Sequence, residues 1–103
     1  MTEATAPAAD LHRTILEERL ATYTARLAEL TDSGMQPDRG GYDQDTLAGL
    51  ISSARQAVEE TTHALRRLDD GTYGRCERCG QDIPAERLEI RPTTRFCVPC
   101  QQR

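Results

Sequence analysis

The stretch that decides the fold is Cys76-Glu-Arg-Cys79, followed after seventeen residues by Cys97-Val-Pro-Cys100. Each Cys-x2-Cys turn points two thiolates at one ion, and two such pairs at this separation are typical of a closed tetrahedral zinc site. Gly80 allows the tight backbone turn that follows the first pair. The spacing therefore predicts a four-cysteine zinc finger in the last third of the chain, with all four thiols holding one structural Zn²⁺.

Other uses of four cysteines are less consistent with the sequence. Disulfides suit exported proteins, but the start Met1-Thr-Glu-Ala-Thr-Ala-Pro has neither the basic nor the apolar part of a signal peptide, so we expect a cytoplasmic protein. A thioredoxin-like redox pair would leave the second pair unexplained. Four protein ligands also leave no position for a metal-bound water, which zinc catalysis requires. We therefore expect no enzymatic activity.

The composition limits how the chain can be stabilised. Its 103 residues are 37% hydrophobic and 4% aromatic, which cannot supply a large core. Structural zinc can contribute on the order of 10 kcal/mol, so the finger is expected to unfold without its metal. No stretch approaches the roughly 20 apolar residues of a membrane span.

Charge differs between the two parts of the chain. Residues 1–71 hold 13 acidic and 7 basic side chains, whereas residues 72–103 hold 4 acidic and 6 basic ones. The whole chain has a net charge of -4 and an isoelectric point near 5.1. A nucleic-acid-binding finger normally shows a strongly basic face, so we expect no direct, sequence-specific binding to nucleic acid.

Residues 10–71 show the pattern of two helices. Residues 1–9 lack periodicity and are predicted to be a disordered tail, and a helix is expected over 10–33, capped by Asp10 and stopped by Gly34. Its apolar residues alternate spacings of four and three, as in a coiled coil. They are Leu16, Leu20, Tyr23, Leu27 and Leu30, with Leu11 and Ile15 beside them.

A second helix is expected over 45–70, ended by Gly71. The residues expected to face the first helix again alternate spacings of three and four residues. They are Ile51, Ala54, Val58, Thr61, Leu65 and Leu68. Three alanines, Ala54, Ala57 and Ala64, would allow close approach. The sequence thus predicts a mainly α protein: an antiparallel two-helix coiled-coil hairpin about 35 Å long over 10–71, followed by a small four-Cys zinc finger over 72–103.

The loop between the helices, residues 34–44, is a candidate site. It is longer than most connections between paired helices, and long loops are often functional. Asp38, Asp43 and Asp45 lie in or beside it with only Arg39 to oppose them, so an acidic tip would attract a basic or metal-bearing partner. The alternative is that Asp43 or Asp45 simply caps the second helix, and the two roles can coexist. The hairpin itself could also be an ordinary one, or half of a homodimeric bundle.

Four further residues have simpler interpretations. His12 and His63 lie far in sequence from the cysteines, and we expect both on the surface. Tyr73 and Phe96 each lie just before a cysteine pair, where packing in the finger core is favoured over stacking on nucleotide bases.

About 30 residues of the finger resemble the DksA/TraR zinc-finger family. The matching features are the Gly71-x-Tyr73-Gly-x-Cys76 entry, Cys79-Gly80, Ile83, Arg87-Leu88, Arg91-Pro92 and the final Cys97-x2-Cys100 pair. A helical hairpin ahead of the finger agrees with this family, whose fold is a coiled coil joined to a four-Cys zinc finger.

The resemblance implies a bacterial transcription regulator that binds RNA polymerase rather than DNA. Members insert the coiled-coil tip through the secondary channel of the polymerase toward its active site and alter initiation. The family's Asp-x-x-Asp-x-Ala tip motif is absent here, and Asp43-x-Asp45-x-x-Ala48 is a loose substitute. Arg87 and Arg91 match family positions near the finger and the polymerase surface, although solvated or fold-locking roles explain them equally well.

Two differences argue against a response to the alarmone ppGpp. Glu60 falls where the long member of the family has a basic residue linked to that nucleotide, and the chain ends three residues after Cys100, without the family's C-terminal helix. We expect a monomer, with a dimer as the alternative. The competing functional hypotheses are a zinc-stapled helical adaptor or self-associating module that binds another protein and, more weakly, a thiol-based redox sensor.

Overall fold

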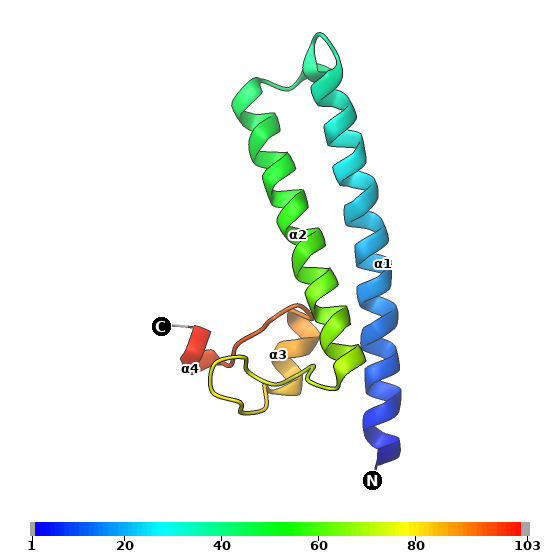
Figure 1. Cartoon of the computed structure of the whole chain (residues 1–103), viewed down its shortest axis with the longest axis vertical. Coiled ribbons are helices and arrows are strands. Elements are labelled where there is room, and N and C mark those ends of the chain that lie inside the picture. Colours follow the sequence, from blue (N-terminus) through cyan, green and yellow to red (C-terminus); the bar gives the residue numbers. More distant parts are fainter. Residues whose placement is uncertain (1, 102–103) are drawn as a thin grey trace.

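Two long antiparallel helices lie side by side and make up most of the protein (Figure 1). Helix α1 spans Thr2–Met35 and α2 spans Gln44–Asp70, with the short 3-10 helix η1, Arg39–Gly41, in the loop that joins them. Two short helices follow in the finger, α3 over Ala85–Ile90 and α4 over Val98–Gln101. The predicted order of a helical hairpin followed by a small finger is confirmed.

The computed structural model describes the backbone of residues 2–101 and the side chains of residues 10–101. Within these residues there is no strand, only an isolated antiparallel bridge between Arg75 and Asp82. The molecule is elongated, with extents of 57 × 30 × 20 Å. None of the described helices is both long and apolar enough to cross a lipid bilayer.

The first helix begins earlier than its sequence pattern indicated. Residues 2–9 were expected to be a disordered tail, but α1 already runs from Thr2, whereas residue 1 lies outside the described part of the chain. Four of the residues 2–9 are alanine, which has the highest helix propensity. These alanines favour a helix that extends beyond the heptad stripe on which the prediction rested, whereas Pro7, which has no backbone N–H to donate, opposes it.

The end of α1 also differs from the prediction. Gly34 was expected to stop the helix in a left-handed conformation, but it lies within α1, which continues to Met35. A Cβ atom at Gly34 would lie 3.6 Å from Cδ2 of Leu47, an ordinary van der Waals contact, so neither the space nor the backbone here requires glycine. The positive φ angles occur later, at Arg39 (53°), Gly40 (62°) and Gly41 (90°), where the chain reverses.

Helix α2 has a defined cap at each end. Asp43 precedes it with an extended backbone, and its side chain accepts a hydrogen bond from the Thr46 N–H. Gly71 follows it at φ 80° and donates its N–H to the Arg67 carbonyl oxygen. The predicted glycine stop is confirmed, because this left-handed conformation is one that glycine adopts at little cost.

The predicted heptad stripes form the seam between α1 and α2. Leu16 and Leu30 are buried on α1, and the other stripe residues of that helix are half-buried. On α2 the buried residues are Leu47, Ala54, Thr61, Ala64 and Arg67. Near the tip, Leu30, Leu47 and Ala54 form one apolar cluster with Leu27, Leu50 and Ile51 around it. The core is thin, as expected for two helices.

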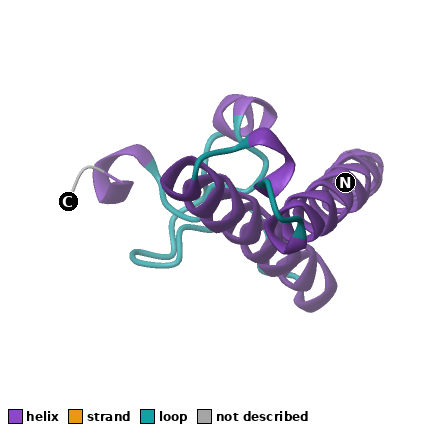
Figure 2. Cartoon of the chain, turned by 90° about the horizontal axis from the view of Figure 1, so that it is seen from above, coloured by secondary structure: helices purple, strands orange, loops and turns teal. Residues whose placement is uncertain are grey.

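The finger has a separate core at the base of α2. Its buried residues are Cys76, Ile83, Leu88, Cys97 and Cys100, with Tyr73 and Phe96 packed against them. Viewed along the hairpin, the finger lies beside α2 on the side away from α1 (Figure 2). The finger and the tip loop are thus at opposite ends of α2.

Candidate metal centre and hairpin tip

The four cysteine sulfurs lie together in the finger. All four are within 4.8 Å of one another, and the sulfurs of Cys79 and Cys97 are 3.6 Å apart. A tetrahedral site with Zn–S bonds of about 2.3 Å has edges of about 3.8 Å, so this donor set fits Zn²⁺. All the cysteines lie in the described part of the chain, and none forms a disulfide.

Local backbone geometry turns the first cysteine pair inward. The N–H groups of Arg78 and Cys79 donate to the Cys76 sulfur over 3.4 and 3.5 Å. Gly80, at φ 77°, closes the turn, and its N–H donates to the Cys76 carbonyl oxygen over 3.0 Å. The Cys76 N–H then donates to the carbonyl oxygen of Gln81, so the two arms of the turn pair like a short hairpin.

Helix α4 places the second pair. Cys97 directly precedes this helix and Cys100 lies in its single turn. The N–H of Gln101 donates to the Cys97 carbonyl oxygen over 2.8 Å, which closes the turn. Because residues three apart lie on one face of a helix, both sulfurs point to the same side.

The electrostatics of the cluster favour a dication. Burial opposes ionisation of the Cys76 thiol, but N–H groups of Cys79, Cys97 and Arg78 donate to its sulfur and lower its pKa to about 5. Burial raises the pKa of Cys100 to about 12, and the neighbouring thiols add to this effect. A bound dication would remove this penalty by neutralising adjacent thiolates. With four thiolates bound, a tetrahedral ion would keep no vertex for a substrate, so the site suits a structural role.

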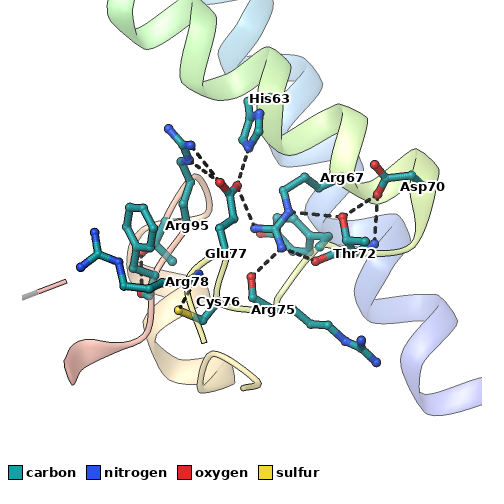
Figure 3. A network of polar contacts seen from close by, with 12 residues as sticks. His63, Arg67, Asp70, Thr72, Arg75, Cys76, Glu77, Arg78 and Arg95 are labelled. Atoms are coloured by element: carbon teal, nitrogen blue, oxygen red, sulfur yellow. Dashed lines mark hydrogen bonds and ion pairs between the residues drawn. The ribbon is translucent and has the colours of Figure 1, made fainter. Parts of the chain in front are cut away.

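A polar network joins the finger to the base of α2 (Figure 3). At its centre, Oε1 of Glu77 accepts from Nε and Nη2 of Arg95 over 3.0 and 2.8 Å. Oε2 contacts Nε2 of His63 and lies 3.2 Å from Nη1 of Arg67. Burial would raise the pKa of Glu77, but the hydrogen bonds from Arg95 and His63 outweigh it and lower this pKa to about 2. The carboxylate therefore stays charged.

Arg67 is the buried member of this network. Only 8% of the residue is exposed, and Nη2 donates to the carbonyl oxygens of Thr72 and Arg75 over 2.7 and 2.6 Å. Its own carbonyl oxygen accepts from the N–H groups of Thr72 and Tyr73. One residue of α2 thus binds the chain that enters the finger on both sides.

Both histidines are partly exposed, as expected of surface residues, but each also contacts the finger. His63 is half-buried against Glu77, and His12 is half-buried with its ring centroid 5.3 Å from that of Tyr73. The Tyr73 hydroxyl donates to the Pro92 carbonyl oxygen over 2.8 Å, and burial raises its pKa to about 12. The predicted core position of Tyr73 is confirmed. Sequence spacing gave no signal for the histidine contacts, because each joins segments far apart in the chain.

At the tip, the three carboxylates have different surroundings. Oδ1 and Oδ2 of Asp43 accept from the N–H and hydroxyl of Thr46 over 2.7 and 2.8 Å. These bonds lower the pKa of Asp43. Asp38 likewise accepts from the Gly40 N–H over 3.0 Å. Asp45 lies exposed in the first turn of α2, and Ala48 is exposed one turn later. The capping role is therefore confirmed for Asp43.

The two candidate arginines of the finger lie on α3 and just after it. Arg87 is half-buried, and its Nε donates to the carbonyl oxygen of Phe96 over 3.4 Å, a fold-locking contact. Arg91 is exposed. Phe96 itself lies beneath two other guanidinium groups, those of Arg78 and Arg95, at 5.5 and 5.6 Å from its ring centroid.

Known proteins share both parts of this arrangement. Residues 71–103 match the family described as prokaryotic dksA/traR C4-type zinc finger. The chain is 35% identical over 91 residues to the RNA polymerase-binding transcription factor DksA of Caulobacter vibrioides. This match covers 86% of this chain and 64% of that protein. It is also 51% identical over 47 residues to general stress protein 16O of Bacillus subtilis, covering 46% of this chain and 29% of that protein.

The likeness extends beyond the finger to the hairpin. The structure of transcription factor DksA2 from Pseudomonas aeruginosa matches 91% of this chain and 80% of its own, with a TM-score of 0.75 and 26% sequence identity. The chain spans less than two thirds of the length of the curated relatives compared above. The match of the four-cysteine finger and the match of the hairpin ahead of it indicate the same family. The chain belongs to the DksA/TraR-type zinc-finger family.

Proposed function

We propose that this chain is a bacterial transcription regulator that binds RNA polymerase through its secondary channel and modulates initiation without catalysing a reaction. The observation that carries the proposal is the pairing of a carboxylate-bearing hairpin tip with a four-thiol finger at the far end of the same helix. Relatives whose sequences match most of this chain, hairpin included, are named RNA polymerase-binding transcription factors. The site of action would be the cytoplasm, where the polymerase works.

The metal in this proposal is one structural Zn²⁺ held by Cys76, Cys79, Cys97 and Cys100. The mutual distances of the sulfurs support this ligand set. When bound, the ion supplies a crosslink between the two halves of the finger rather than a reactive group. The finger would then dock outside the channel, with Arg91 exposed toward the polymerase and Arg87 contributing mainly by holding the Phe96 carbonyl.

The tip would act inside the channel through Asp45 rather than Asp43. Both residues are exposed, but the carboxylate of Asp43 already accepts two hydrogen bonds from Thr46. Ala48 lies three residues after Asp45, on the same face of α2, so a small side chain adjoins the carboxylate. This pair presents one negative charge beside a small side chain, which suits a basic or metal-bearing site. Helix α2 has 27 residues, or about 40 Å, which gives the reach to a recessed site.

Binding and photocrosslinking would test the proposal. A photoreactive amino acid is placed at Tyr42 in the tip loop, and in a second protein at Leu11 near the other end of α1, where 60% of the side chain is exposed. With core RNA polymerase of the same organism, the Tyr42 probe is expected to crosslink to segments lining the active site. The Leu11 probe is expected to crosslink only to surface segments or to none.

Tip variants then separate binding from action. Asp45→Asn removes the exposed charge and is expected to abolish the effect on initiation while the chain still binds polymerase. Asp43→Asn is the matched control, because its amide oxygen still accepts from the Thr46 N–H. Absence of polymerase binding at micromolar concentration would contradict the proposal. A stable dimer that buries the heptad faces, found by sedimentation together with indifference to both tip variants, would instead favour an adaptor.

A further inference from the structure

The joint between hairpin and finger is polar, unlike the interior of either part. The apolar cluster of the hairpin lies near the tip and that of the finger at the base of α2, and no residue belongs to both. Between them lies the network around Glu77 (Figure 3). The contacts that cross this joint include the hydrogen bonds and ion pairs of Glu77 and Arg67 and the rings of His12 and Tyr73, whose centroids are 5.3 Å apart, so hydrogen bonds and charge supply much of what holds the finger at its angle to α2.

Three segments meet at one carboxylate. Glu77 belongs to the first cysteine turn, His63 and Arg67 to the last turns of α2, and Arg95 to the loop before the second cysteine pair. The Glu77 side chain is 22% exposed, so these bonds are partly shielded from water. Its backbone takes part as well, since the Glu77 N–H donates to the Arg95 carbonyl oxygen over 2.9 Å.

Arg67 needs this carboxylate more than the other two cations do. Its guanidinium is nearly buried, and its further bonds go to neutral groups, the carbonyl oxygens of Thr72 and Arg75 and the hydroxyl of Thr72. A buried cation that loses its partner carries a large desolvation cost. His63 and Arg95 are more exposed, with 38% and 47% of their side chains accessible, so they can turn to water.

We propose that Glu77 is a positioning residue: its carboxylate fixes the orientation of the finger relative to α2 by binding Arg67 and His63 on one side and Arg95 on the other. Replacement by glutamine keeps the shape but removes the charge and one acceptor site. The finger, whose fold rests on its own cysteines and apolar residues, then stays folded but changes its orientation to α2 or samples several. The part of the inference that concerns polymerase rests on the proposed function, whereas the orientation itself does not.

Residual dipolar couplings measured by NMR test the orientation in the isotope-labelled, zinc-loaded full chain. In the wild type, couplings from α2 and from the finger are expected to fit one alignment tensor with the arrangement in Figure 1. In Glu77→Gln, the couplings from α2 and those from the finger are expected to fit different alignment tensors. The tensor of the finger is expected to be the smaller in magnitude. Glu89→Gln is the matched control, since it removes an exposed carboxylate of α3 from the same finger.

Two further measurements distinguish a change of orientation from a loss of folding of the finger, since either could give separate alignment tensors. Cadmium NMR of the metal-substituted protein is expected to give the same shift in the wild type and Glu77→Gln, which shows an intact metal site. His63→Ala removes one partner of Glu77 while leaving every residue of the finger unchanged, and it is expected to loosen the orientation in the same direction but less. A single tensor of wild-type arrangement in both Glu77→Gln and His63→Ala overturns the proposal.

Polymerase binding is measured separately, so that the two proposals can fail independently. If the finger samples orientations of which a fraction is competent, the apparent Kd rises by the inverse of that fraction, and we expect a roughly threefold to tenfold increase for Glu77→Gln. A wild type that does not bind polymerase counts against the proposed function, while the couplings still decide the role of Glu77. Separate tensors with unchanged affinity support the positioning role and overturn only its link to binding.

Discussion

The hairpin and the finger are stabilised in opposite ways. The hairpin spreads its burial along two helices, so that Leu16, Leu30 and Leu47 each contribute over a long seam. The finger concentrates its burial around the metal site, where three of the four cysteines are buried: Cys76 is 3% exposed, as little as Leu30 at 4%. A single substitution in the hairpin seam therefore removes only part of its stability, whereas a single change at the metal site can unfold the whole finger. Variants that remove one contact from each part should therefore have very different effects.

Loss of the metal is expected to have the largest effect, and only on the finger. Cys100→Ser, or chelation of the wild type, removes a contribution on the order of 10 kcal/mol that the small finger core cannot replace. NMR signals of residues 72–101 should collapse into the range of unfolded chains, while far-UV circular dichroism from α1 and α2 stays near the wild-type value. Zinc should restore the chelated wild type but not the variant. Simultaneous unfolding of the hairpin would show that the two parts are one cooperative unit.

A cavity in the seam is expected to have the next largest effect. Leu16 has no exposed surface, so Leu16→Ala should lower the free energy of unfolding of the hairpin by about 2 to 5 kcal/mol. Urea titration followed by circular dichroism measures this change. Leu11→Ala is the control on the same helix, because Leu11 is 60% exposed and its truncation should be nearly neutral. Equal effects of both variants would mean that the seam is not where the hairpin gains its stability.

The cap at the tip is expected to have a smaller effect that depends on pH. Asp43→Ala removes both bonds to Thr46 and should lower the thermal midpoint of the hairpin less than Leu16→Ala does. These bonds lower the pKa of Asp43 below its ordinary 3.8. Its contribution is therefore fully present above about pH 4 and is lost as the pH falls through the lower folded pKa.

A comparison with Asp43→Asn isolates that pH dependence. The amide still accepts from the Thr46 N–H but does not titrate, so the midpoint of this variant should fall less steeply below about pH 4 than that of the wild type. Melting curves recorded from neutral to acidic pH provide the measurement. Parallel curves for the two proteins would show that the charge on Asp43 contributes nothing to the cap.

The smallest effect is expected for the ion pair between the two helices near the base. Arg13 Nη2 lies 2.8 Å from Oδ1 of Asp69, but 37% and 69% of the two side chains are exposed. Asp69→Asn should therefore change the free energy of unfolding by less than about 1 kcal/mol, and salt should erase the difference. Urea titrations at low and high salt measure both quantities. A larger, salt-resistant loss would make this pair part of the joint with the finger.

Much of the fold could be predicted because its signals are local. The two cysteine turns, the heptad stripes and the glycine stop at Gly71 each lie within a few residues of what they determine. The cap role of Asp43 was also predictable, because a carboxylate three residues before a threonine at a helix start has an established geometry. The stop expected at Gly34 was wrong because glycine can also continue a helix, and the residues with positive φ come later, at 39–41.

The joint could not be predicted because its partners are distant in sequence and irregular in spacing. His63 and Glu77 are brought together only by the path of the chain after Gly71, and nothing near either residue indicates the other. Arg67 lies beside the apolar stripe of α2 and looks like one of several exposed arginines. Its burial follows from the carbonyl groups of Thr72 and Arg75, which carry no sequence signature.

The attachment of the finger at one end of α2, with the tip at the other, has a mechanical consequence (Figure 1). Over the roughly 40 Å of this helix, a rotation of only about 0.1 radian at the base displaces the tip by about 4 Å. That displacement exceeds the reach of a hydrogen bond. If a partner holds the finger, α2 converts small rotations at its base into large displacements of the tip. The position of Asp45 in the complex then depends on the bonds of Glu77 at the opposite end of the molecule.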